Sequence, residues 1–235
     1  MSLLAGFKTD NSIENEVDSV GNGGAIDTGI YAVKVAMAYV MKSKGGATGI
    51  VLHLKTADKR EVRQTLWISS GDAKGNKNYY ETKDGERKYL PGFNLFQSLC
   101  LLTVGKDVHE MATADKTITI YSPEAKKEVP TEMPVLMDLL DQEVYAGIFK
   151  QTVDKTQKTD AGEYVATGET RDENELDKFF RAEDKLTTAE IRGGSEEAVF
   201  YNTWNEKWTG VTRDKTSKDS GKSGVTPVHF SFQVL

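Results

Sequence analysis

Apolar and polar residues alternate with a period of two along the first third of the chain, which is typical of half-buried strands. Over residues 30–40 the bulky residues occupy alternate positions: Tyr31, Val33, Val35, Met37 and Tyr39. The positions between them hold Ile30, Ala32, Lys34, Ala36 and Ala38. Residues 49–56 and 61–69 alternate in the same way after short turns. The pattern predicts a three-stranded antiparallel meander.

Beyond the meander the pattern changes several times. Residues 70–91 are predicted to form a long polar loop, and residues 93–102 a short helix that is apolar nearly all round and therefore buried. Strands are predicted at residues 117–121 and 143–153, with a short helix at 134–140 between them. Three strands, a helix and then further strands is the order of an OB-fold, a partly open five-stranded barrel. We therefore expect a mainly β protein with helices: an OB-type barrel, with a helix between strands three and four and a C-terminal extension.

The remaining residues suggest further segments around that barrel. Residues 175–181 are predicted to be helical, with Leu176, Phe179 and Phe180 on one face. The polar run at 209–224 is typical of a flexible linker, and residues 228–234 alternate as a strand. The expected organisation is an acidic N-terminal arm (1–27), an OB domain (28–155), a helical and aromatic extension (156–208), and a linker with a terminal strand (209–235).

Composition places the chain among globular proteins, with 38% hydrophobic and 28% charged residues. No apolar run reaches the roughly 20 residues of a membrane span, and no signal peptide is recognised, so we expect the host cell cytoplasm. The single Cys100 excludes an intramolecular disulfide framework and is expected in the core. The three His residues are far apart in the sequence, so we expect no metal and no cofactor.

Charge is distributed unevenly. The net charge is −6, yet residues 41–90 contain eleven basic and six acidic residues. A basic segment inside an acidic protein can bind a polyanion at one place. An ordinary surface of mixed charge is the alternative explanation.

Aromatic and basic residues are interleaved across the meander and the following loop. Single-strand binders need cations for phosphates and flat side chains on which bases stack. Trp67 lies on the predicted strand face that also carries Arg63, opposite the apolar face. The candidate DNA contacts are Lys34, Lys42, Lys44, Arg63, Trp67, Lys74, Lys77, Tyr79, Tyr80 and Arg87. The alternative is that Trp67 belongs to the core, the tyrosines cap it, and Lys42 and Lys44 mark a solvated hairpin tip.

The sequence contains no recognisable catalytic motif. Residues 71–77 lack the spacing of a phosphate-binding loop, and His109-Glu110 has no second histidine at the spacing of a zinc protease. We therefore predict a protein that is not an enzyme.

Several short segments resemble a known family, the phage-encoded single-stranded DNA-binding proteins. They are GIYAVK (29–34), KSKGGA (42–47), KNYY (77–80), YLPGFN (89–94), LCLL (99–102), VYAGIFKQ (144–151) and NELDKFF (174–180). The resemblance implies an OB-fold that protects single-stranded DNA during phage DNA replication and recombination, with little sequence preference. It also implies DNA contacts by Lys34, Lys42, Lys44, Arg63, Trp67, Lys77, Tyr79 and Tyr80. The chain departs from many single-strand binders at its C-terminus, which is apolar rather than acidic.

Two other functions compete with this interpretation. A strand-annealing recombination mediator would bind single strands but form rings or filaments. A phage protein-interaction module would use the terminal strand at 228–234 for β-augmentation and would not bind DNA. The expected partners are single-stranded DNA, replication or recombination proteins, and a second copy of the chain through its C-terminal strand.

Overall fold

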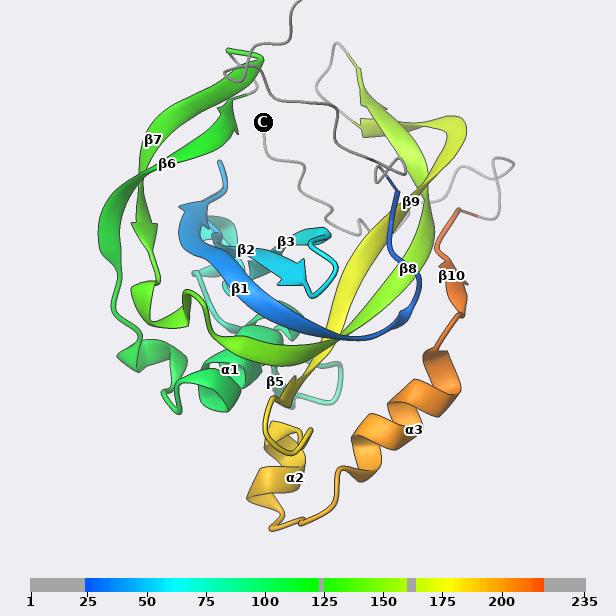
Figure 1. Cartoon of the computed structure of the whole chain (residues 1–235). Coiled ribbons are helices and arrows are strands. Elements are labelled where there is room, and N and C mark those ends of the chain that lie inside the picture. Colours follow the sequence, from blue (N-terminus) through cyan, green and yellow to red (C-terminus); the bar gives the residue numbers. More distant parts are fainter. Residues whose placement is uncertain (1–23, 123–124, 160–163, 218–235) are drawn as a thin grey trace, which may run out of the picture.

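The computed structural model describes residues 24–122, 125–159 and 164–217. This part of the chain is mainly β, with one large sheet whose strands are antiparallel except at β10 (Figure 1). The sheet curves strongly but does not form a closed barrel. A separate two-stranded hairpin and three α-helices complete the described fold.

The predicted meander is confirmed. Strands β1 (Gly29–Lys42), β2 (Thr48–Thr56) and β3 (Glu61–Trp67) pair in sequence order and antiparallel. The β1–β2 turn at 43–47 also supports a neighbouring loop, because Gly45 O accepts a hydrogen bond of 2.8 Å from Asp72 N.

A β-bulge in β1 changes the predicted distribution of its side chains. The register with β2 shifts between Val35 and Met37, so one additional residue is accommodated there. Val33 and Val35 therefore pack in the main core, whereas Met37 and Tyr39 pack in a second cluster. The prediction of one bulky face running from Tyr31 to Tyr39 is wrong, because strand periodicity does not continue through a bulge.

That second cluster lies beneath a hairpin formed by β6 (Ala114–Ser122) and β7 (Lys127–Val135). The strand predicted at 117–121 lies within β6. The helix predicted at 134–140 is wrong: Pro134 pairs with Asp115 in the hairpin, and only Met137–Leu139 forms a 3-10 turn, η3. β7 pairs with β1 of the meander at one residue pair, Tyr39 and Val135. Most of that edge of β7 is therefore not paired with β1, and a proline is acceptable on such an edge because it has no N–H to donate.

Strands β8 (Glu143–Lys158) and β9 (Tyr164–Arg181) form a second, longer hairpin. The strand predicted at 143–153 lies within β8. The helix predicted at 175–181 is wrong, because these residues continue β9. A register shift between Gly147 and Ile148 places Leu176 and Phe179 in the same core although they are three residues apart. The bulge thus imitates the spacing of a helix.

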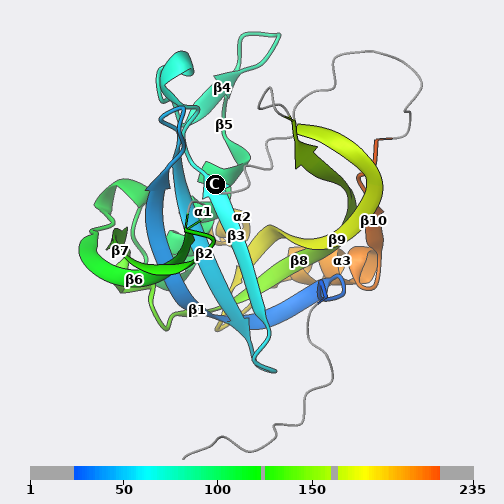
Figure 2. The same ribbon diagram turned by 90° about the horizontal axis from the view of Figure 1, so that it is seen from above.

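β8 joins this hairpin to the meander. It pairs with the first half of β1, for example at Gly29 and Ile148, so the strand order is β3–β2–β1–β8–β9. The sheet therefore extends beyond residue 155, where we expected the barrel to end. Figure 2 shows the strands curving round so that β3 and β9 stand at the two ends of this order.

Helix α1 (Pro91–Thr103) confirms the helix predicted at 93–102. Proline suits the first position of a helix, because a backbone N–H there would have no acceptor within the helix and its absence costs nothing. Phe96, Leu99 and Cys100 are buried in the main core beneath the curved sheet. The 3-10 turn η2 (Val108–Glu110) follows α1.

The connection at 70–91 contains more structure than the predicted loop. It includes a 3-10 turn, η1 (Asp72–Lys74), and a short hairpin of β4 (Tyr79–Glu81) and β5 (Arg87–Tyr89). This hairpin is not part of the large sheet.

The C-terminal part adds α2 (Thr188–Arg192), α3 (Val199–Trp208) and β10 (Thr212–Asp214). Trp204 of α3 packs with Phe149 and Phe180 in a third cluster on the sheet. β10 pairs parallel with β8, so residues 212–214 of the linker predicted at 209–224 form a strand instead. The part of that prediction beyond residue 217 lies outside the described residues. The predicted terminal strand at 228–234 lies outside the described residues, as does the acidic arm up to residue 23. Every helix in the described ranges is too short or too polar to cross a bilayer.

Candidate nucleic-acid interface

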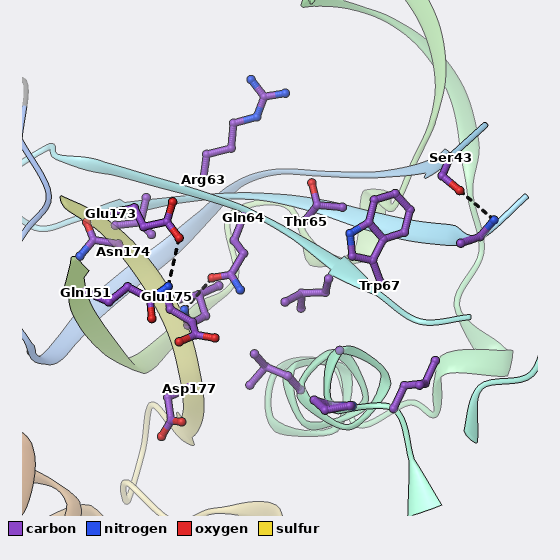
Figure 3. A pocket seen from close by; sticks show the side chains of 18 of the residues that line it. Ser43, Arg63, Gln64, Thr65, Trp67, Gln151, Glu173, Asn174, Glu175 and Asp177 are labelled. Carbon is purple, nitrogen blue, oxygen red and sulfur yellow. Dashed lines mark hydrogen bonds between the residues drawn. The ribbon is translucent and has the colours of Figure 1, made fainter. Parts of the chain in front are cut away.

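A groove of about 1340 Å³ runs between β3 and β9. Its lining comes from both strands, the β1–β2 turn, η1 and the start of α1, together with residues 24–25 and Tyr121. Across part of this groove, Gln64 Oε1 accepts a hydrogen bond of 2.6 Å from the backbone N–H of Leu176. A side chain thus spans the two strands at this position (Figure 3).

The β3 wall carries the predicted stacking and cationic residues. Arg63, Thr65 and Trp67 point to the same side of the strand, away from α1 (Figure 3). The Trp67 ring lies over Gly49, where an added Cβ would approach ring atoms to 3.0 Å. Arg63 Nη2 donates a hydrogen bond of 3.1 Å to the Tyr39 hydroxyl, which orients the guanidinium.

One end of the groove is bounded by the polar connection after β3. Lys74 on η1 lines the groove and is exposed. Lys77 lies next to the lining, because its backbone N–H donates to Ser70 Oγ over 3.0 Å and Ser70 is a lining residue. Lys42 and Lys44 are exposed beside the turn that lines this end, but they are not lining residues themselves.

The β4–β5 hairpin gathers the other predicted loop residues. Lys77 Nζ lies 5.6 Å from the centre of the Tyr79 ring, and the Arg87 guanidinium lies 5.0 Å from it. Tyr80 is 46% exposed, so a flat ring is available to a ligand. These residues flank the groove without lining it. Lys34 is separate from both groups and forms an ion pair of 3.4 Å with Glu143.

The β9 wall was missed in the sequence. All of residues 171–177 line the groove, together with Gln151 of β8, and four of them carry carboxylates: Asp172, Glu173, Glu175 and Asp177. The charged run RDENELD at 171–177 could have indicated a polar wall. The predicted helix at 175–181 hid it, because it placed the first four residues of the run outside the helix and the last three inside.

These side chains are held by neighbours. Glu173 Oε1 accepts a hydrogen bond of 3.0 Å from Gln151 Nε2. The other oxygen of the same carboxylate, Oε2, forms an ion pair of 3.1 Å with Arg171 Nη2. Asp177 Oδ2 accepts a hydrogen bond of 2.8 Å from the indole N–H of Trp204. Glu175 forms an ion pair of 3.5 Å with Arg213. The groove therefore has one wall with aromatic and cationic groups and one rich in carboxylates.

The first described residues pass beside the β9 wall. The Asn174 side chain makes two hydrogen bonds to the backbone of Ile26. Its Oδ1 accepts a bond of 2.9 Å from Ile26 N, and its Nδ2 donates a bond of 2.8 Å to Ile26 O. The amide therefore pairs with this residue as another strand would. Ile26 is buried in the main core, and Gly24 and Ala25 continue into the groove lining.

Burial shifts the pKa values of two titratable groups near the groove, His53 and Cys100. Burial lowers the pKa of His53, and the neighbouring Arg63 lowers it further, although Glu61 at 2.8 Å from Nδ1 acts in the opposite direction. Burial raises the pKa of the Cys100 thiol to about 12, which keeps the sulfur protonated at neutral pH. Among the residues that the structure describes, no three His, Cys, Asp or Glu side chains are grouped so as to hold a metal ion.

The sequence matches no protein-family model, and no similar curated protein was found. Function is therefore inferred from the groove and its residues.

Proposed function

We propose that the chain binds single-stranded DNA in the groove between β3 and β9, without strong sequence preference and without catalysing a reaction. The observation that carries the proposal is the β3 wall, where Arg63 and Trp67 face the same side of one strand. A cation for the phosphates and a flat ring for a base are the two groups that single-strand binding needs. The seven residues of β3 extend over about 20 Å, which is long enough for several nucleotides.

The loop beyond β3 supports an extended phosphate path. Lys74 lines the groove, and Lys77 and Arg87 lie around Tyr79 on the adjoining hairpin. A strand that leaves the groove at this end meets exposed cations and the exposed Tyr80 ring. Binding should then weaken with salt, because each neutralised phosphate releases counterions.

We also infer that the architecture is a partly open OB-type barrel. Its five strands would be β1, β2, β3, β8 and β9, with α1 between the third and fourth strands. The β6–β7 hairpin would be an insertion before the fourth strand. In support, the strand order is β3–β2–β1–β8–β9, and Gln64 links the two outermost strands. This assignment replaces the strands at 117–121 and 143–153 that we expected as the fourth and fifth.

The resemblance to phage-encoded single-stranded DNA-binding proteins extends the proposal to a biological role. We infer that the chain protects single-stranded DNA during phage DNA replication and recombination. The segments that resemble the family include YLPGFN at 89–94, which forms the end of β5 and the start of α1 beside the groove.

Fluorescence titration with a labelled oligo-dT and with the matching duplex, each at two salt concentrations, tests the proposal. We expect tight and salt-sensitive binding to the single strand, and weak binding to the duplex. The Trp67→Ala variant should bind the single strand more weakly while unfolding at a similar temperature. Absence of single-strand binding at low salt would contradict the proposal and favour a protein-interaction role.

A further inference from the structure

The two walls of the groove differ in the hydrogen-bonding groups they offer. The β3 wall and the adjoining loop supply the cations Arg63 and Lys74 and the Trp67 ring, with one carboxylate, Glu61. The β9 wall supplies mostly acceptors: the carboxylates of Asp172, Glu173, Glu175 and Asp177. Phosphates are repelled by carboxylates, so a DNA backbone should follow the β3 side. The base edges would then face β9.

Two buried polar atoms on the β9 side of the groove have no hydrogen-bond partner. Gln151 is only 3% exposed, and its Oε1 has no hydrogen-bond partner. Arg171 Nε is also buried and unpaired. These are two of the three buried side-chain polar atoms without a partner in the described part of the chain. Buried polar atoms are nearly always paired, so an acceptor and a donor left over beside one groove suggest a ligand that supplies their partners.

Glu173 connects the two unpaired groups. Its Oε1 accepts a hydrogen bond from Gln151 Nε2, and its Oε2 forms an ion pair with Arg171 Nη2. The same carboxylate thereby orients the Gln151 amide and the Arg171 guanidinium. An ionised carboxylate has about four lone-pair sites, so Glu173 retains acceptor capacity for a ligand.

We propose that the Gln151–Glu173–Arg171 cluster prefers bases that carry an amino group beside a ring acceptor, namely cytosine and adenine, over thymine and uracil. Both unpaired atoms are buried in this structure, so the side chains of the cluster would have to open slightly to admit a base. The amino group would then donate to Gln151 Oε1 or Glu173, and the ring nitrogen would accept from Arg171 Nε. Carboxylates are known acceptors for the cytosine amino group, and single-stranded bases expose this edge. Thymine and uracil present a carbonyl oxygen at the same place, which a carboxylate repels. This inference rests on the proposed function and adds a bias in base composition to it.

Oligo-dC and oligo-dU of equal length provide the sharpest comparison, because their bases differ only in the amino or carbonyl group and in the proton on the ring nitrogen. We expect the wild-type chain to bind oligo-dC about tenfold more tightly than oligo-dU at neutral pH. Glu173→Gln keeps the side-chain size but replaces one acceptor oxygen with a donor. It should reduce the ratio of the two affinities towards one.

Glu169→Gln is the matched control, because Glu169 lies on the same strand, pairs with Lys155 at 2.8 Å and does not line the groove. It should leave the ratio unchanged. Thermal unfolding verifies that each variant folds. Gln151→Met removes the unpaired Oε1 of the cluster while keeping a side chain of similar length. It serves as a second variant if Glu173→Gln does not fold, and it should also lower the ratio.

The outcomes separate this inference from the proposed function. Tight binding of both oligonucleotides with equal affinity would overturn the base preference and leave single-strand binding in place. A preference that persists in folded Glu173→Gln and Gln151→Met would also overturn it. Failure to bind either oligonucleotide at low salt would overturn the proposed function and this inference together.

Discussion

Gln64 on β3 accepts a hydrogen bond of 2.6 Å from the backbone N–H of Leu176 on β9. This bond joins strands that are far apart in the sequence and at the two ends of the order β3–β2–β1–β8–β9. Leu176 is buried in the main core, so its N–H depends on this partner. The side chain of Gln64 thus replaces a backbone contact and leaves space for the groove.

Replacement of Gln64 by methionine should lower the free energy of unfolding by about 1–3 kcal/mol, because a buried N–H would lose its acceptor. Urea denaturation measures the change. Gln157→Met is the control, since Gln157 is an exposed residue of β8, and it should change stability by less than about 0.5 kcal/mol. Equal stability of the two variants would show that Leu176 N–H finds another acceptor.

Trp67→Ala should weaken binding to single-stranded DNA by about 1–3 kcal/mol, the usual contribution of one base–aromatic stack. Trp67→Phe keeps a flat ring and should recover most of the affinity. The measurement is titration with a labelled oligonucleotide, alongside thermal unfolding of each variant. Unchanged affinity in a folded Trp67→Ala variant would assign Trp67 a packing role over Gly49.

Lys74→Ala should reduce the salt dependence of binding. Loss of one phosphate contact should make the slope of log affinity against log salt concentration less steep by about 0.7 for a single strand. Lys207→Ala is the control, because Lys207 is an exposed cation on α3 and does not line the groove. Identical slopes for the two variants would exclude Lys74 from the phosphate path.

Gly92→Ala should destabilise the fold. An added Cβ would lie 2.8 Å from the backbone nitrogen of Trp67 and closer still to its carbonyl oxygen, so α1 and β3 would have to separate. We expect a loss of about 1–3 kcal/mol in urea denaturation, the usual cost of overpacking. Asn94→Ala, at an exposed position of the same helix, should have little effect. A stable Gly92→Ala variant would show that the two elements can move apart easily.

Cys100 should be inert in the folded chain. Burial raises its pKa from 9.0 to about 12, so the reactive thiolate is absent at pH 8 and reagents cannot reach the sulfur. We expect slow labelling by a thiol reagent in buffer and rapid labelling in urea. Fast labelling of the folded chain would show that α1 opens readily.

The same shift predicts a pH effect on stability. Below pH 9 the thiol is protonated in both states, so Cys100 causes no pH dependence there. As the pH rises from 9 towards 12, the unfolded chain ionises first, and stability is lost over that interval. A Cys100→Ala variant should lack this part of the alkaline decline in urea midpoints.

Local patterns were sufficient where one strand or helix follows a single period. The alternation at 49–56 and 61–69 predicted β2 and β3, and the apolar run at 93–102 predicted α1. The errors occurred at bulges. An extra residue between Val35 and Met37 exchanged the faces of β1, and another beside Gly147 gave β9 the three-residue spacing of a helix.

The candidate site shows the same division. Arg63, Trp67 and Lys74 were found because rings and cations within one continuous segment are visible without knowledge of the fold. The opposite wall was missed because Gln151 and Glu173 come from a distant hairpin, and only strand pairing brings them to the groove.

The sequence by itself therefore determined the meander, the buried helix and the cationic, aromatic wall, since these depend on contacts between near neighbours in the chain. Only the tertiary structure decided that β9 lies beside β3, and that carboxylates and an unpaired amide line the same groove as Trp67. The reason is physical: pairing register and bulges are set by the packing of the whole sheet, and a shift of one residue turns a side chain from the core to the opposite face.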